Sequence, residues 1–112
     1  MGIHHCAPGE VVNLLRLNEQ LPNDATFAIV KTDRMEVIRM FLPKGKKIPG
    51  HSVSGAITVH CISGRLTFNV DNEPNELQAA DWLFLSPNQE HSLHAFEDSV
   101  VLVTILLAIL PA

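Results

Sequence analysis

Apolar and polar residues alternate along much of this chain in short segments. The clearest case is the segment 65–70, in which Leu66, Phe68 and Val70 alternate with polar side chains. A period of two residues is typical of a β-strand with one face in the core and the other in solvent. No segment keeps the 3.6-residue period of a helix over about three turns. The pattern therefore predicts an all-β protein.

Turn-forming residues separate the segments that we predict to be strands. The predicted strands are Thr26–Lys31, Met35–Leu42, Ala56–Ile62, Arg65–Val70, Glu76–Gln78, Trp82–Leu85, Ser92–Phe96 and Ser99–Ile109. Short strands at this regular spacing indicate a sandwich or a barrel. The segment 43–50 combines lysines with glycines and prolines, and we predict a loop there. Residues 11–17 are apolar enough for either a short strand or a single helical turn.

Length and composition favour one folded domain. A chain of 112 residues has the usual size of a single domain, and 46% apolar residues are too many for a disordered chain. We expect residues 1–24 to be a lead-in with a short strand or turn, and residues 25–112 to form a barrel domain. The last predicted strand is continuously apolar, which suggests that a second subunit covers one of its faces in a homodimer.

Charge, hydropathy and cysteine content narrow the partners and the compartment. The net charge is −4 and the basic residues form no stripe, so we expect no binding of nucleic acid. The apolar run 100–110 is too short to span a membrane as a helix, and no basic amphipathic helix indicates a membrane surface. Two cysteines, Cys6 and Cys61, are too few for a disulfide-stabilised secreted domain, which predicts reduced thiols in a cytoplasmic protein.

Two histidines are the main candidates for chemistry. His51 closes the loop 45–50 and His91 closes the loop 86–90, so each lies where a loop feeds a strand. Such junctions stand at the mouth of a barrel, where ligand-binding groups concentrate. We therefore expect the two imidazoles to converge on a shared pocket. The alternative is a pair of mouth histidines that only backbone groups or water satisfy.

The segments around these histidines resemble the two motifs of the cupin superfamily. Gly45, His51 and, after a strand, Gly64 match the first motif, and residues 80–91 match the second. Further segments similar to a group of small bacterial cupins are 30–34, 57–65 and 93–99. The resemblance covers residues 27–108 and implies a double-stranded β-helix, a jelly-roll barrel of two antiparallel sheets. This fold hosts unrelated activities, so the resemblance names none.

The resemblance also implies a metal site from which two ligands are missing. The four ligand positions of the superfamily correspond to His51, Val53, Ile57 and His91. The two remaining imidazoles suit a divalent transition metal such as Zn, Fe, Ni, Cu or Mn, but they leave the rest of the coordination shell to water or substrate. We therefore expect any metal to bind weakly and folding not to require it.

The other histidines and cysteines are weaker candidates. Cys61 shares the strand parity of Ile57 at a deeper level, and a small buried hydrophobe is the expected role. His60 and His94 have the opposite parity and should face away from the barrel interior. Residues 4–6 (His-His-Cys) have suitable ligand chemistry but belong to an end of the chain that we expect to be mobile.

These observations leave two functional hypotheses open. The first is binding of a small molecule in the barrel cavity, and the second is a metal-dependent enzyme of the cupin dioxygenase or isomerase type that uses His51 and His91. Stoichiometric transition metal in the purified protein would favour the enzyme. The lysine-bearing stretch 43–49 is expected to be a solvated loop, with a contact to an anionic ligand as the alternative. The residues predicted to form the ligand site are His51, Ile57, Val59, Phe68, His91 and Leu93.

Overall fold

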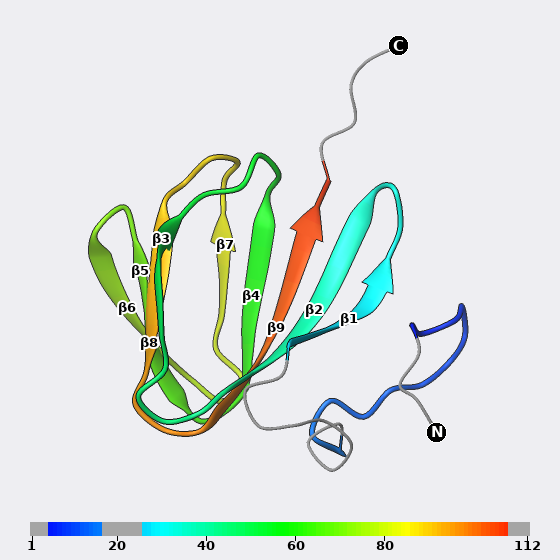
Figure 1. Ribbon diagram of the computed structural model, residues 1–112, viewed down its shortest axis with the longest axis horizontal. Coiled ribbons are helices and arrows are strands. Elements are labelled where there is room, and N and C mark those ends of the chain that lie inside the picture. Colours follow the sequence, from blue (N-terminus) through cyan, green and yellow to red (C-terminus); the bar gives the residue numbers. More distant parts are fainter. Residues whose placement is uncertain (1–4, 17–25, 108–112) are drawn as a thin grey trace.

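The computed structural model describes residues 5–16 and 26–107, and these residues form an all-β structure (Figure 1). Its strands are β1 (Thr26–Lys31), β2 (Met35–Leu42), β3 (Lys47–His51), β4 (Ile57–Ser63), β5 (Arg65–Val70), β6 (Glu73–Gln78), β7 (Trp82–Leu85), β8 (His91–Ala95) and β9 (Ser99–Leu106). One sheet has five strands in the order β1-β2-β9-β4-β7, and the other has four in the order β3-β8-β5-β6. All their pairings are antiparallel.

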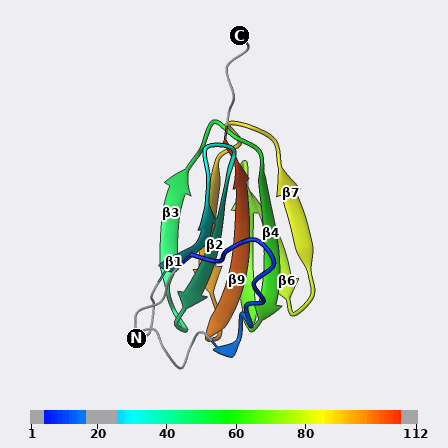
Figure 2. The same cartoon turned by 90° about the vertical axis from the view of Figure 1, so that its right-hand side faces the viewer.

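The two sheets face each other as the walls of a flattened barrel, and their inner faces supply the core (Figures 1 and 2). Every second residue of a strand points inward. On β4 these are Ile57, Val59 and Cys61, and on β5 they are Leu66 and Phe68, all of them buried in one core cluster. The predicted all-β jelly-roll barrel of two antiparallel sheets is therefore confirmed.

The predicted strands agree with most of the observed ones. The bounds of β1, β2, β5 and β7 are those predicted, and β4 and β8 shift by a single residue. The strand β6 begins earlier than predicted, because Asp71 and Asn72 alone make the preceding turn, with φ angles of 50° and 69°. Two residues with positive φ are typical of a tight hairpin turn.

The prediction of a loop over 43–50 is wrong in part, because β3 occupies residues 47–51. This strand lies at the edge of the four-stranded sheet, and within residues 5–16 and 26–107 its pairing partner is β8. An edge strand tolerates Pro49, since one side of the strand needs no N–H for the sheet. For residues 11–17 the alternatives were a short strand and a single helical turn. In the described residues 11–16 there is no strand, and Leu14 and Leu15 form a turn.

An N-terminal segment lies across the outer face of the five-stranded sheet and crosses β2 and β9 in Figure 2. The backbone N–H of Cys6 donates to the carbonyl oxygen of Ile29 at 2.7 Å. Arg39 on β2 is fully buried beneath the segment, and its Nε donates to the carbonyl oxygen of Leu14 at 3.0 Å. The ring of His5 lies 6.3 Å from that of Phe27. Residues 5 and 6 therefore contact the sheet, and the mobility of this end of the chain stays a prediction.

Three sequence predictions fall outside the described residues. They are the role of His4, the domain boundary between residues 24 and 25, and the end of the last strand at Ile109. Within residues 5–16 and 26–107, no helix is long and apolar enough to cross a membrane.

Candidate functional site

The structure brings His51 and His91 together at one end of the barrel. His51 is the last residue of β3, His91 is the first residue of β8, and the two are register partners across this pair of strands. Their ring centroids lie 4.3 Å apart at an interplanar angle of 61°. His51 thus ends a strand instead of leading into one, because 47–51 is itself strand. The convergence nevertheless follows, because the neighbouring strands are antiparallel.

Backbone carbonyl groups fix the orientation of both rings. The Nδ1 atom of His51 lies 3.1 Å from the carbonyl oxygen of Pro49, and Nδ1 of His91 lies 3.1 Å from the carbonyl oxygen of Gln89. A carbonyl oxygen only accepts hydrogen bonds, so each Nδ1 must carry the proton. In a neutral ring the lone pair is then on Nε2. The two histidines therefore present two Nε2 acceptors.

The core forms the floor beneath this pair. The ring of Phe68 on β5 stacks on that of His91, with centroids 5.5 Å apart and planes inclined by 12°. His91 is 7% exposed, whereas His51 is exposed. Burial lowers the pKa of His91, and the nearby His51 lowers it further, while the hydrogen bond to the Gln89 carbonyl acts in the opposite direction. The inner ring therefore tends to remain neutral where an ordinary histidine becomes protonated.

The other predicted lining residues lie deeper. Ile57, Val59 and Leu93 all belong to the buried core cluster together with Phe68. Val59 has no exposed surface, and Ile57 is 3% exposed. Phe68 is the member of this group that contacts a mouth histidine. Of the six residues predicted to form the ligand site, His51 alone is exposed, and the other five are buried.

The donor set fits a transition metal poorly. Within residues 5–16 and 26–107, no group of three or more His, Cys, Asp or Glu side chains could hold a metal ion. Val53 packs against the apolar core and Ile57 is part of it, so the other two superfamily positions offer no ligand. Catalytic zinc normally keeps three protein ligands. Two imidazoles alone are an incomplete site.

The remaining candidate ligands lie elsewhere. Cys61 is fully buried. This burial raises the pKa of its thiol, and the charge of Asp81 raises it further. The Sγ atom lies 3.5 Å from the carbonyl oxygen of Ser63. His60 pairs with Trp82 in the register of β4 and β7. His94 lines a groove on the outer face of the other sheet. Both histidines thus face away from the interior, as expected from strand parity.

Backbone partners for the two histidines were the alternative expected from the sequence, but the carbonyl groups of Pro49 and Gln89 were not identified as these partners. Both stand two residues before a histidine, in the segments Pro49-Gly50-His51 and Gln89-Glu90-His91. The shared spacing is a weak signal in the sequence, because many loops bring a carbonyl group near a side chain two residues later. Only the backbone path shows that both rings use it.

We predict that the His91 environment makes the stability of the fold depend on pH. Because the pKa of folded His91 lies below the ordinary value of 6.5, the unfolded chain takes up a proton first as pH falls. The contribution of His91 to the free energy of unfolding should therefore be complete above pH 6.5. It should decline as pH falls from 6.5 to the pKa of folded His91. Thermal melting of wild type and His91→Asn between pH 8 and pH 5 tests this. Parallel profiles for the two proteins would contradict it.

Many solved structures share this fold, and three of them illustrate the likeness. A cupin superfamily protein from Desulfitobacterium hafniense has a TM-score of 0.81 at 14% identity, over 96% of this chain and 100% of that protein. A conserved protein of unknown function from Streptococcus pyogenes has a TM-score of 0.77 at 18% identity, over 98% and 100%. A DMSP lyase from Ruegeria pomeroyi has a TM-score of 0.67 at 15% identity, over 79% of this chain and 48% of that protein.

These likenesses define the class of fold. No protein-family model matches the sequence, and no curated protein matches it. At identities below 20%, the structural agreement establishes the cupin fold and leaves the activity open. The protein is therefore a small barrel with the cupin fold and a pair of histidines at its mouth.

Proposed function

We propose that the protein binds a small molecule at the barrel mouth, where it contacts His51 and His91. The observation that carries this proposal is the orientation of the two rings, whose Nδ1 atoms are both engaged by backbone carbonyl groups. Two neighbouring Nε2 acceptors over an aromatic floor suit a ligand with hydroxyl or amide N–H donors and an apolar body. Ile57, Val59, Phe68 and Leu93 form the apolar wall behind the pair.

The ring nitrogens themselves provide the test. In ¹⁵N-labelled protein, NMR should show a proton on Nδ1 of both rings. A screen of polyols, hydroxylated aromatics and amides should include compounds that shift both Nε2 resonances. The variant His51→Ala should lose this binding, while the matched variant His94→Ala on the outer face should keep it. A screen at millimolar concentration that shifts neither ring would overturn the proposal.

The second candidate function is a metal-dependent enzyme of the cupin dioxygenase or isomerase type. The specific observation in its favour is the closeness of the two imidazole rings, whose centroids lie 4.3 Å apart. The DMSP lyase of the same fold is an example of an enzyme built on this scaffold. Because only two protein ligands converge, the first proposal has the stronger support.

We predict that removal of metal leaves the stability unchanged. A metal present at 100 times its dissociation constant would stabilise the fold by about 2.7 kcal/mol, which corresponds to about 10 °C or more in melting temperature for a domain of this size. With two ligands, treatment with EDTA should shift the melting temperature far less. His51→Ala should abolish any Zn²⁺ binding without unfolding the protein, because His51 is exposed. A large drop in melting temperature with EDTA, reversed by one particular metal, would instead indicate a complete metal site.

We also propose that the protein is a homodimer through the outer face of the five-stranded sheet. This face carries the exposed apolar side chains Trp82 and Phe84 of β7 and Leu106 of β9, which are 58%, 56% and 53% exposed. Exposed apolar groups in so small a domain favour a self-complementary contact. Light scattering at micromolar concentration should give the dimer mass.

The double substitution Trp82→Ser, Phe84→Ser should shift the protein to the monomer. The matched control is Phe96→Ser, which removes a half-buried aromatic side chain from the outer face of the other sheet, beside Arg65 and His94, and it should leave the dimer intact. A wild-type monomer mass would contradict the proposal.

The proposed compartment is the cytoplasm. It is supported by Cys6 and Cys61, which are both free thiols, because disulfides are rare in a reducing compartment. Fractionation of cells that express the full natural protein would test this.

A further inference from the structure

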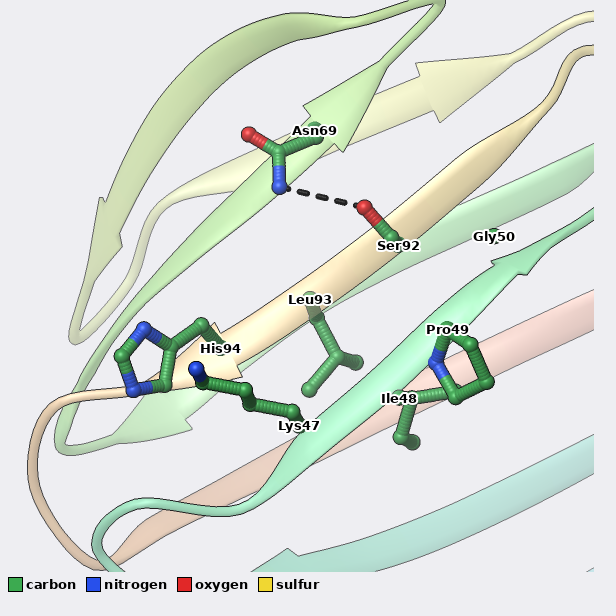
Figure 3. Close-up of a pocket in the computed structure, with 8 residues that line it drawn as sticks. All are labelled: Lys47, Ile48, Pro49, Gly50, Asn69, Ser92, Leu93 and His94. Atoms are coloured by element: carbon green, nitrogen blue, oxygen red, sulfur yellow. Dashed lines mark hydrogen bonds between the residues drawn. The ribbon is translucent and has the colours of Figure 1, made fainter.

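A groove lies on the outer face of the four-stranded sheet, on the opposite side of the sheet from the barrel interior (Figure 3). Pro49 and Gly50 of β3 form one side of it, and Asn69 of β5 with Ser92 and His94 of β8 form the other. Its volume is about 480 Å³, within the usual range for small-molecule sites. The barrel-mouth histidines do not line it.

An irregularity in the pairing of β3 with β8 shapes this groove. Ile48 pairs with Leu93 and His51 pairs with His91, so the two residues Pro49 and Gly50 lie opposite the single residue Ser92. Such a bulge bends its strand and interrupts the ladder of hydrogen bonds. The N–H that proline lacks also removes a donor at this position. The surface therefore opens where a regular strand pair would be closed.

Side chains of opposite charge lie at and beside the groove. Lys47 and His94 are register partners at one end, and Figure 3 shows the Lys47 side chain extending toward the His94 ring. Glu90 does not line the groove itself, but its carboxylate lies beside the lining residue Gly50, since a Cβ built on Gly50 would be 3.1 Å from Oε1 of Glu90. In the described part of the chain, neither Lys47 nor Glu90 forms a salt bridge.

Neutral polar groups also line the groove. Nδ2 of Asn69 donates to Oγ of Ser92 at 3.1 Å, and Figure 3 shows this pair on the surface of the groove. Among the described residues, neither side chain makes a second hydrogen bond. The amide oxygen and one amide hydrogen of Asn69, together with the Ser92 hydroxyl hydrogen, are thus available to a peptide group.

We propose that this groove binds a short peptide with free termini, of two or three residues. The C-terminal carboxylate lies at Lys47 and His94, the N-terminal ammonium lies at Glu90, and a peptide group bonds to Asn69 and Ser92. The lengths agree: three residue steps along a strand from Lys47 to Gly50 span about 10 Å, and an extended tripeptide spans about the same. A single amino acid is too short to reach both charges.

Titration with trialanine, followed by ¹H–¹⁵N NMR, tests the proposal. Shifts should be confined to residues 47–50, 69, 90 and 92–94, the imidazole resonances of His51 should not move, and binding should weaken as salt rises. Exposed charge pairs contribute modestly, so Lys47→Gln and Glu90→Gln should each weaken binding about two- to fivefold. N-acetyl-trialanine, which lacks the ammonium group, should bind more weakly by a similar factor, and its affinity should not change in Glu90→Gln. The affinity of trialanine amide, which lacks the carboxylate, should not change in Lys47→Gln.

Two matched controls separate this site from general charge effects. Lys46→Gln and Glu73→Gln remove exposed charges of the same type outside the groove, and both should leave the affinity for trialanine unchanged. The proposal fails if trialanine causes no saturable shifts at about 10 mM, ten times a millimolar dissociation constant. It also fails if the blocked peptides or simple propionate bind equally well, or if the shifts appear at the barrel mouth. None of these outcomes depends on what binds to His51 and His91.

Discussion

Phe68→Ala is expected to lower the free energy of unfolding by about 3–5 kcal/mol, as for other large aromatic side chains removed from a core. Phe68 is 3% exposed and belongs to the buried cluster between the two sheets. Its ring also stacks on His91, so the substitution leaves a cavity directly below the mouth. Urea denaturation followed by circular dichroism gives the free energy directly.

The control for this prediction is Phe96→Ala. Phe96 is half-buried on the outer face, where Arg65 lies 5.1 Å from its ring centroid and His94 lies 4.8 Å away. The same change of side chain should there cost only about 1 kcal/mol. In Phe68→Ala the ring resonances of His91 should also shift, because the stacked partner is gone. A loss below about 1 kcal/mol would show that Phe68 does not support the core.

The alternation of side chains made the inner face of the barrel predictable from the sequence. On β5, Leu66 and Phe68 are buried as their parity requires, and on β4 the same holds for Val59 and Cys61. The parity rule depends only on the local geometry of a strand. It therefore succeeded for the inner faces of β4 and β5.

The strand β3 was missed because its residues are typical of a turn and not of a strand. Pro49 and Gly50 are turn formers in isolation, and β3 exists because β8 supplies the pairing partner. The burial of Arg39 was equally beyond local reasoning. Its cover comes from a segment 25 residues earlier in the chain, through the carbonyl group of Leu14. Long-range contacts of this kind leave no trace in periodicity.

The candidate site was predictable in its residues but not in its chemistry. His51 and His91 could be selected because each stands at a junction of loop and strand, and because the surrounding motifs resemble those of cupins. The tautomer of each ring depends on a backbone carbonyl group, whose direction is set by the path of the chain. The peptide groove depends on a bulge, which is a property of two paired strands and of neither alone.

Gly55→Ala is the second substitution expected to have a large effect, with a loss of about 3 kcal/mol in the free energy of unfolding. Gly55 lies in the connection between β3 and β4, and a Cβ atom there would overlap the backbone carbonyl group of Leu106 at the end of β9. A rotamer change cannot relieve this overlap, because both groups belong to the backbone. Either the connection or the end of β9 must move, and the hydrogen bond from Leu106 N–H to the Ala56 carbonyl oxygen must weaken.

Gly45→Ala separates this steric effect from backbone strain. Gly45 has a φ of +89° but nothing within 4 Å of an added Cβ, so its substitution costs only the left-handed conformation, about 1–2 kcal/mol. The loss of stability from the steric clash at Gly55 should exceed this cost.

Gly55→Ala should also disturb the site, because the same connection follows His51 directly. The Val53 carbonyl group in this connection accepts a hydrogen bond from Asn88 N–H at 2.8 Å. The ring resonances of His51 should therefore shift in Gly55→Ala and remain in place in Gly45→Ala. Equal losses of stability with unchanged His51 resonances would show that β9 does not position the mouth.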